Sequence, residues 1–98
     1  ALEFDYPDAT AEAEIVAHEA RIEPALAATL VDIARHSRAL RARGLDEGIS
    51  TRMLVYAGVL IRDGLPAAES CHMAMTSAIT DDPDLRQALQ DIVDACLG

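Results

Sequence analysis

The chain of 98 residues has room for one domain but not for two. It is 51% hydrophobic and 26% charged, which is typical of a globular protein and excludes a disordered one. Seventeen acidic residues against eight basic ones, all of them arginine, give a net charge of −9, which argues against nucleic acid or an anionic membrane surface as a partner. No apolar run approaches the ~20 residues that span a bilayer, and the signal-peptide pattern is missing, so we expect a cytoplasmic protein.

The first residues differ from the rest of the chain in their hydrophobic pattern. Apolar and polar residues alternate with period two up to Tyr6, and Pro7 holds the residue before it out of a helix. We therefore expect an extended segment over residues 1–7, leading in from a domain that precedes it. Residues 8–98 read as helical throughout, and the fold class we predict is all-α, a bundle of about five helices.

The first two helices are delimited by local signals. The first is expected at residues 9–20, capped by Asp8 or Thr10, and peripheral because it has few large apolar residues. The second begins at Pro24, where a missing N–H costs nothing, and stops at Gly44. Its inner face is the stripe Leu26, Leu30, Ile33, Ser37 and Leu40.

The third helix has the clearest boundaries, with Ser50 as the N-cap and Gly64 just past the end. Between them, residues 53–61 are nine consecutive apolar residues, which predicts a helix buried on every face at the centre of the domain. Gly58 costs about 1 kcal/mol relative to alanine in a helix interior, so we expect another helix to cross close to it.

The last two helices each begin at a proline. The fourth is expected from Pro66, at its first position, to about Ala78, and the fifth from the Asp82–Pro83 step. The inner face of the fourth is predicted to be Ala68, Cys71, Met75 and Ile79. That of the fifth is predicted to be Leu85, Leu89, Ile92, Val93 and Cys96.

The start of the third helix is the candidate functional site. Arg52 stands in the first turn, where the helix dipole disfavours a cation by roughly 0.3–1 kcal/mol. With the free N–H groups of the turn and the hydroxyls of Ser50 and Thr51, it forms a site suited to an anion such as phosphate. The alternative is a structural ion pair between Arg52 and Asp46 or Glu47 in the preceding loop.

The segment LDEGISTRMLVYA, residues 45–57, resembles the lid of the CbbQ/NirQ/NorQ branch of MoxR-type AAA+ ATPases. Residues 2–7 resemble the crossing from the ATPase core into the lid, and residues 80–84 with the helix after them resemble the C-terminal extension. The resemblance covers nearly the whole chain, and the loop with its Ser-Thr-Arg step is the most specific part.

The resemblance implies that Arg52 is the sensor-2 arginine, which reaches the γ-phosphate of ATP bound with Mg²⁺ by the core. It implies ring-forming ATPases that act as chaperones, remodelling a client enzyme of the Rubisco or nitric oxide reductase type. The implied partners are the core domain, neighbouring subunits and the client. The chain departs from the pattern in lacking a P-loop, Walker-B acids and sensor 1, so we expect no ATP hydrolysis by this chain alone.

A different class of function remains open, a stand-alone acidic helical module that binds proteins through an exposed apolar patch. A helix-turn-helix DNA-binding domain is disfavoured by the net charge. Arg35, Arg38 and Arg41 line one face of the second helix; we interpret them as a solvated face, the alternative being a subunit contact in a ring.

Metal and thiol chemistry have weaker support. His18 and His36 lack a second ligand at metal spacing, and Cys71–His72 with Met75 is better explained by packing. The acids at positions 81, 82 and 84 lack the spacing of a calcium loop. Cys71 and Cys96 are too few for a disulfide framework and predict two reduced thiols. We therefore expect no metal site.

Overall fold

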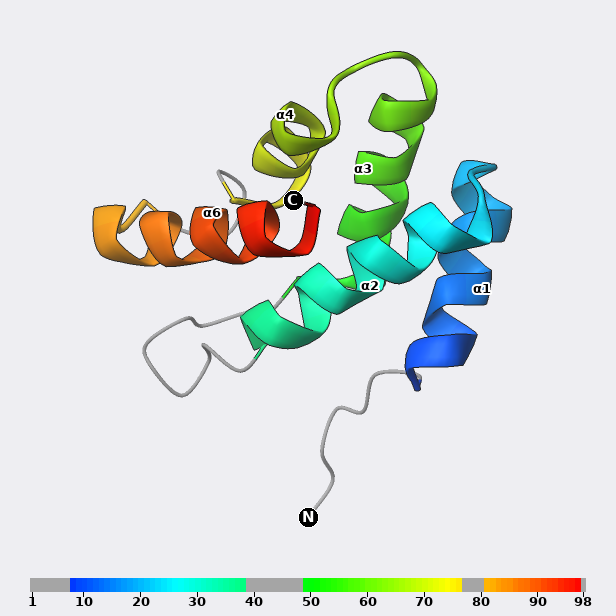
Figure 1. Cartoon of the computed structure of the whole chain (residues 1–98), viewed down its shortest axis with the longest axis horizontal. Coiled ribbons are helices and arrows are strands. Elements are labelled where there is room, and N and C mark those ends of the chain that lie inside the picture. The colour runs from blue at the N-terminus through cyan, green and yellow to red at the C-terminus, as the bar shows by residue number, and fades with distance from the viewer. Residues whose placement is uncertain (1–7, 39–48, 77–80, 98) are drawn as a thin grey trace.

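The computed structural model describes residues 8–38, 49–76 and 81–97, and within these residues it is all-α (Figure 1). The elements are α1 (Ala9–Ala20), α2 (Pro24–Arg38), α3 (Thr51–Arg62), α4 (Ala67–Cys71), the π-helical segment η2 (His72–Thr76) and α6 (Pro83–Leu97). The expected extended segment 1–7 and the Gly44 stop lie outside the described residues. The predicted fold class is confirmed.

Helix α2 runs diagonally across the molecule (Figure 1). It packs against α1, α3 and α6, while α4 and η2 contact both α3 and α6. One core joins these elements because each contributes at least one fully buried apolar side chain. These include Val16, Leu30, Ile33, Leu54, Cys71, Met75 and Val93.

The caps form as the local sequence predicts. Asp8 Oδ1 accepts a hydrogen bond from Ala11 N at 2.8 Å, and Asp82 Oδ1 accepts one from Asp84 N at 2.8 Å. At the end of α3, Gly64 has φ +109°, and the amides of Gly64 and Leu65 donate to the carbonyls of Ile61 and Leu60, both at 3.0 Å. That pair of bonds is a Schellman motif, which satisfies carbonyls that the last turn would leave open.

Helix α3 is less buried than its nine apolar residues predict. Only Leu54, Ala57 and Gly58 are buried, and Tyr56 is 49% exposed. The expectation of burial on every face was wrong because α1, α2, α4 and η2 pack around part of the helix and leave one side open. The close crossing at Gly58 is confirmed: a Cβ there would lie 2.8 Å from Ala20 Cβ.

The fourth predicted helix also differs from expectation. Pro66 is its N-cap rather than its first residue, and α4 gives way at His72 to the π-helical turn η2. Ala68, expected on the inner face, is exposed, whereas Cys71 and Met75 are buried as predicted. Ala74, three residues after Cys71 within η2, is also buried in the core. Residues 77–80, including Ala78 and Ile79, lie outside the described residues.

Candidate functional site

The first turn of α3 is fixed by its cap and by the residue before the cap. Ser50 has extended backbone angles, and its Oγ accepts a hydrogen bond from Met53 N at 3.2 Å. Ile49, just before the cap, and Leu54, in the next turn, are both buried in the main core. An apolar pair at these two positions is a hydrophobic staple, which sets the angle at which the chain enters the helix.

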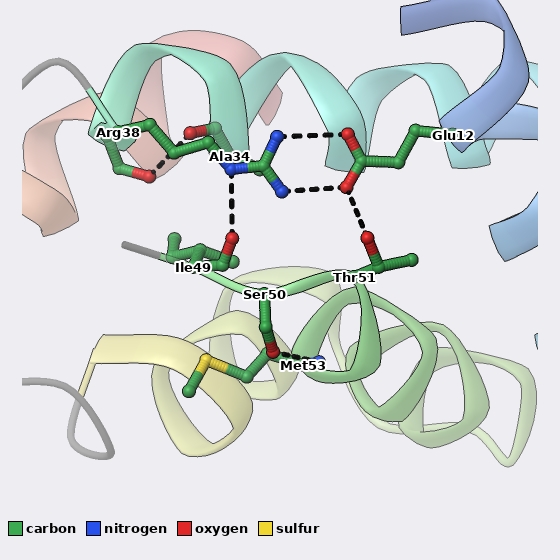
Figure 2. A network of polar contacts seen from close by, with 8 residues as sticks. Glu12, Ala34, Arg38, Ile49, Ser50, Thr51 and Met53 are labelled. Carbon is green, nitrogen blue, oxygen red and sulfur yellow. Dashed lines mark hydrogen bonds and ion pairs between the residues drawn. The ribbon is translucent and has the colours of Figure 1, made fainter. Parts of the chain in front are cut away.

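A buried ion pair lies directly against this turn (Figure 2). Glu12 of α1 has no exposed surface, and the Arg38 side chain of α2 is 10% exposed. The guanidinium donates to both carboxylate oxygens, at 2.9 and 2.7 Å. This is the bidentate geometry that makes an arginine–carboxylate pair strong and directional.

The same two side chains hold the residues on either side of the Ser50 cap. Arg38 Nε donates to the Ile49 carbonyl at 2.9 Å, and Thr51 Oγ1 donates to Glu12 Oε2 at 2.8 Å (Figure 2). We call Glu12, Arg38, Ile49 and Thr51 the junction network. It joins α1, α2 and the start of α3 at one point.

The environment of Glu12 keeps its carboxyl ionised. Burial raises its pKa, but the hydrogen bonds from Arg38 and Thr51 and the charges of Arg38 and Arg35 lower it by more. The net effect is a pKa below the usual value of 4.5. The network therefore contains a charged, fully bonded carboxylate at neutral pH.

Arg52 is exposed and lies one residue beyond this network. Within the described residues its side chain has no hydrogen bond or ion pair. Asp46 and Glu47, the partners of the alternative interpretation, lie outside the described residues. Of the three predicted site residues, Ser50 and Thr51 use their hydroxyls inside the domain, whereas Arg52 presents its charge to solvent.

The three arginines expected to form one solvated face of α2 do not share one environment in the structure. Arg35 is exposed, as a solvated face requires, and Arg41 lies outside the described residues. For Arg38 the expectation of a solvated side chain was wrong. It turns inward and pairs with Glu12, which lies 26 residues earlier in the chain. The sequence does contain a signal that Glu12 faces inward, because it is spaced at i, i+4 and i+8 with the buried residues Val16 and Ala20.

Other candidate chemistry is sparse in the described part of the chain. It contains no group of three His, Cys, Asp or Glu side chains arranged to hold a metal ion. Cys71 is a buried free thiol, and Cys96 is a partly exposed one. Over the same residues, no helix is long and apolar enough to cross a membrane.

Two of the surface hollows among the described residues lie apart from the Ser50–Arg52 turn. A groove of about 600 Å³ between α1 and α2 is mostly apolar and is lined in part by Ala13, Ala17, Ala28 and Val31. A more polar hollow of about 340 Å³ lies between η2 and α6 and is lined in part by Thr76, whose buried hydroxyl has no hydrogen-bond partner among the described residues.

Fold and site together define a small all-α domain in which a buried ion pair anchors a helix N-terminus carrying an exposed arginine. The family model described as "CbbQ/NirQ/NorQ C-terminal" matches residues 12–96. The chain belongs to this family.

Three relatives illustrate the similarity. The chain is 56% identical over 92% of its length to Protein CbbQ of Hydrogenophilus thermoluteolus. It is 43% identical over 96% of its length to the denitrification regulatory protein NirQ of Pseudomonas aeruginosa, and 38% identical over all of it to Protein NorQ of Paracoccus denitrificans. The chain covers 34–36% of each relative, about a third of its length.

Proposed function

We propose that this chain is the helical lid of an AAA+ ATPase and that Arg52 is its sensor-2 arginine. In this proposal the core domain of the parent protein binds ATP and Mg²⁺, and Arg52 contacts the γ-phosphate. The guanidinium stabilises negative charge on the transferred phosphoryl group and makes the lid position depend on the nucleotide. The parent remodels a client enzyme of the Rubisco or nitric oxide reductase type.

The exposed charge of Arg52 at an anchored helix N-terminus is the observation that carries the proposal. A cation in this turn is unfavourable in the lid alone, because the N–H groups of the turn already make it positive. An anion removes that conflict by binding both the N–H groups and the guanidinium. Ser50 and Thr51 serve the site by holding this turn in place, as their hydrogen bonds to Met53 N and Glu12 indicate.

The test is Arg52→Ala in the full-length ATPase, with Arg86→Ala on α6 as the matched control. Loss of one charge-stabilising donor predicts a fall in ATP turnover of roughly 10²-fold, with an unchanged thermal midpoint. Arg86→Ala removes an arginine far along the chain from the α3 turn and is expected to retain normal turnover.

Normal ATP turnover and normal KM for ATP in the Arg52→Ala protein would contradict the proposal. The stand-alone interaction module would then be the better explanation, favoured by the apolar α1–α2 groove and by Ile15, which is 42% exposed on α1.

A further inference from the structure

We infer that Thr51 is a positioning residue for Arg52: its hydroxyl ties the first turn of α3 to the buried Glu12–Arg38 pair, so the placement of the arginine follows α1 and α2. This inference rests on the proposed function of Arg52. It assigns to the junction network a role in regulating that site, in addition to holding the fold together.

The charge of Glu12 is balanced without Thr51. Arg38 already donates to both carboxylate oxygens, and the N-cap of α3 is already supplied by the Ser50 hydroxyl. The third bond to Glu12, from Thr51 Oγ1 at 2.8 Å, is therefore needed neither to neutralise the carboxylate nor to cap the helix. Its distinct effect is to fix the backbone next to Arg52 relative to α1.

The Glu12–Arg38 ion pair makes one hydrogen bond to the residue before Ser50 and one to the residue after it. The Ile49 carbonyl is bound by Arg38 and the Thr51 hydroxyl by Glu12, so the cap cannot shift along α3 without breaking one of them (Figure 2). Arg52 is exposed and follows directly, so a shift of this backbone carries the guanidinium with it. A misplacement of about 1 Å at such a group is enough to cost up to roughly 10²-fold in rate.

Helices α1 and α3 are also joined at a second place, so a movement of α1 is expected to move α3 with it. Near the other end of both helices, Arg62 Nη1 donates to the Ala20 carbonyl at 3.1 Å, and Gly58 allows Ala20 to approach closely. Contacts at both ends make the two helices move together. We therefore expect any displacement of α1 in the full-length ATPase to reach the turn that carries Arg52.

The test uses the full-length ATPase with Thr51→Val, which removes the hydroxyl but keeps the shape of the side chain. The matched control is Ser37→Ala, which removes a buried hydroxyl that donates to Ala34 within α2, outside the network. Loss of one oriented hydrogen bond predicts a fall in kcat/KM for ATP of about three- to tenfold. The Ser37→Ala protein is expected to keep its kcat/KM at a comparable thermal midpoint, and Thr51→Ser, which retains the hydroxyl, to recover most of the loss.

A double-mutant cycle with Arg52→Ala decides whether Thr51 acts through the arginine. If it does, Thr51→Val has little further effect on turnover once Arg52 is gone. Wild-type kinetics of Thr51→Val, or effects that multiply in the double variant, would overturn the inference while leaving the proposed function in place. Normal turnover of Arg52→Ala by itself would remove the proposed function. Should Thr51→Val fail to fold, Thr51→Ala enters the same cycle.

Discussion

Cys71 and Cys96 lie in different surroundings, although both are free thiols. Cys71 has no exposed surface, and burial, with a smaller effect from Cys96, raises its pKa to about 11. The pKa of Cys96 is also raised, by burial and by the charge of Asp32, but its side chain is partly exposed. Since the thiolate is the reactive form, access and ionisation both favour Cys96.

We therefore expect a disulfide reagent at pH 8 to modify Cys96 readily and Cys71 only when the protein unfolds. With a pKa of about 11, only about one Cys71 thiol in a thousand is ionised at that pH. The rates are measured on Cys71→Ser and Cys96→Ser proteins, each with one thiol, with and without urea. Equal rates for the two thiols in the native protein would show that Cys71 is accessible.

At the scale of the elements, the crossing of α1 and α3 depends on the missing side chain of Gly58. An added Cβ would lie 2.8 Å from Ala20 Cβ and 3.0 Å from Ile22 Cδ1. Ala20 Cβ cannot rotate away, so α1 itself would have to shift. Gly58→Ala gains about 1 kcal/mol in helix propensity but overpacks the crossing at a cost of about 1–3 kcal/mol. We expect a net loss of roughly 1 kcal/mol in the free energy of unfolding, measured with urea.

The control is Ala20→Gly, which removes the atom that the new Cβ would meet. Ala20→Gly itself costs about 1 kcal/mol in helix propensity, but in the double variant it relieves the clash, so the losses of stability from the two changes should be less than additive. A Gly58→Ala protein that is more stable than the wild type would mean that the crossing is looser than the structure shows.

The sequence predicts an element well where the residues that determine it lie within or next to that element. Ser50, Gly64 and the Asp82–Pro83 step act within one turn of their own positions, so the ends of α3 and the start of α6 agree with expectation. The π-helical turn at His72 and the exposure of Ala68 have no comparable local signal, because they depend on which helices pack nearby.

The same limit applies to the candidate site. The cap and the position of Arg52 follow from the sequence alone, since a helix start is a local feature. The pairing of Glu12 with Arg38 joins residues 26 positions apart, and the buried stripe of α1 shows only that Glu12 faces inward. The partner of Glu12 depends on the angle at which α1 packs against α2. The hydrophobic pattern of a single helix carries no information about that angle.

At the scale of the whole molecule, the junction network makes stability depend on one buried charge. Because the pKa of Glu12 is below 4.5 in the folded protein, the unfolded chain takes up a proton at this residue first as the pH falls. The pair therefore contributes its full stabilisation above about pH 5. That contribution is lost progressively as the pH falls through 4.5 and then through the lowered pKa.

We expect Glu12→Gln to weaken the acid dependence of stability. The measurement is the free energy of unfolding in urea from pH 7 to pH 3, with the exposed Glu14→Gln on the same helix as the control. Removing one titrating group reduces the slope below pH 5 by up to about 1.4 kcal/mol per pH unit. The variant also breaks the buried ion pair with Arg38, and removing one partner of such a pair costs about 3–5 kcal/mol at neutral pH.

Replacing both charges separates these two effects. Glu12→Leu with Arg38→Met removes the titrating group without leaving a buried charge, so it should recover much of the neutral-pH stability and still show the weaker acid dependence. Thr51 and the Ile49 carbonyl would lose their partners in this protein, so recovery should be incomplete. An acid dependence as steep as in the wild type, in either variant, would place the acid-sensitive groups elsewhere in the molecule. A neutral-pH stability of the double variant no better than that of Glu12→Gln would mean that the three helices are held at this junction by the hydrogen bonds more than by the charges.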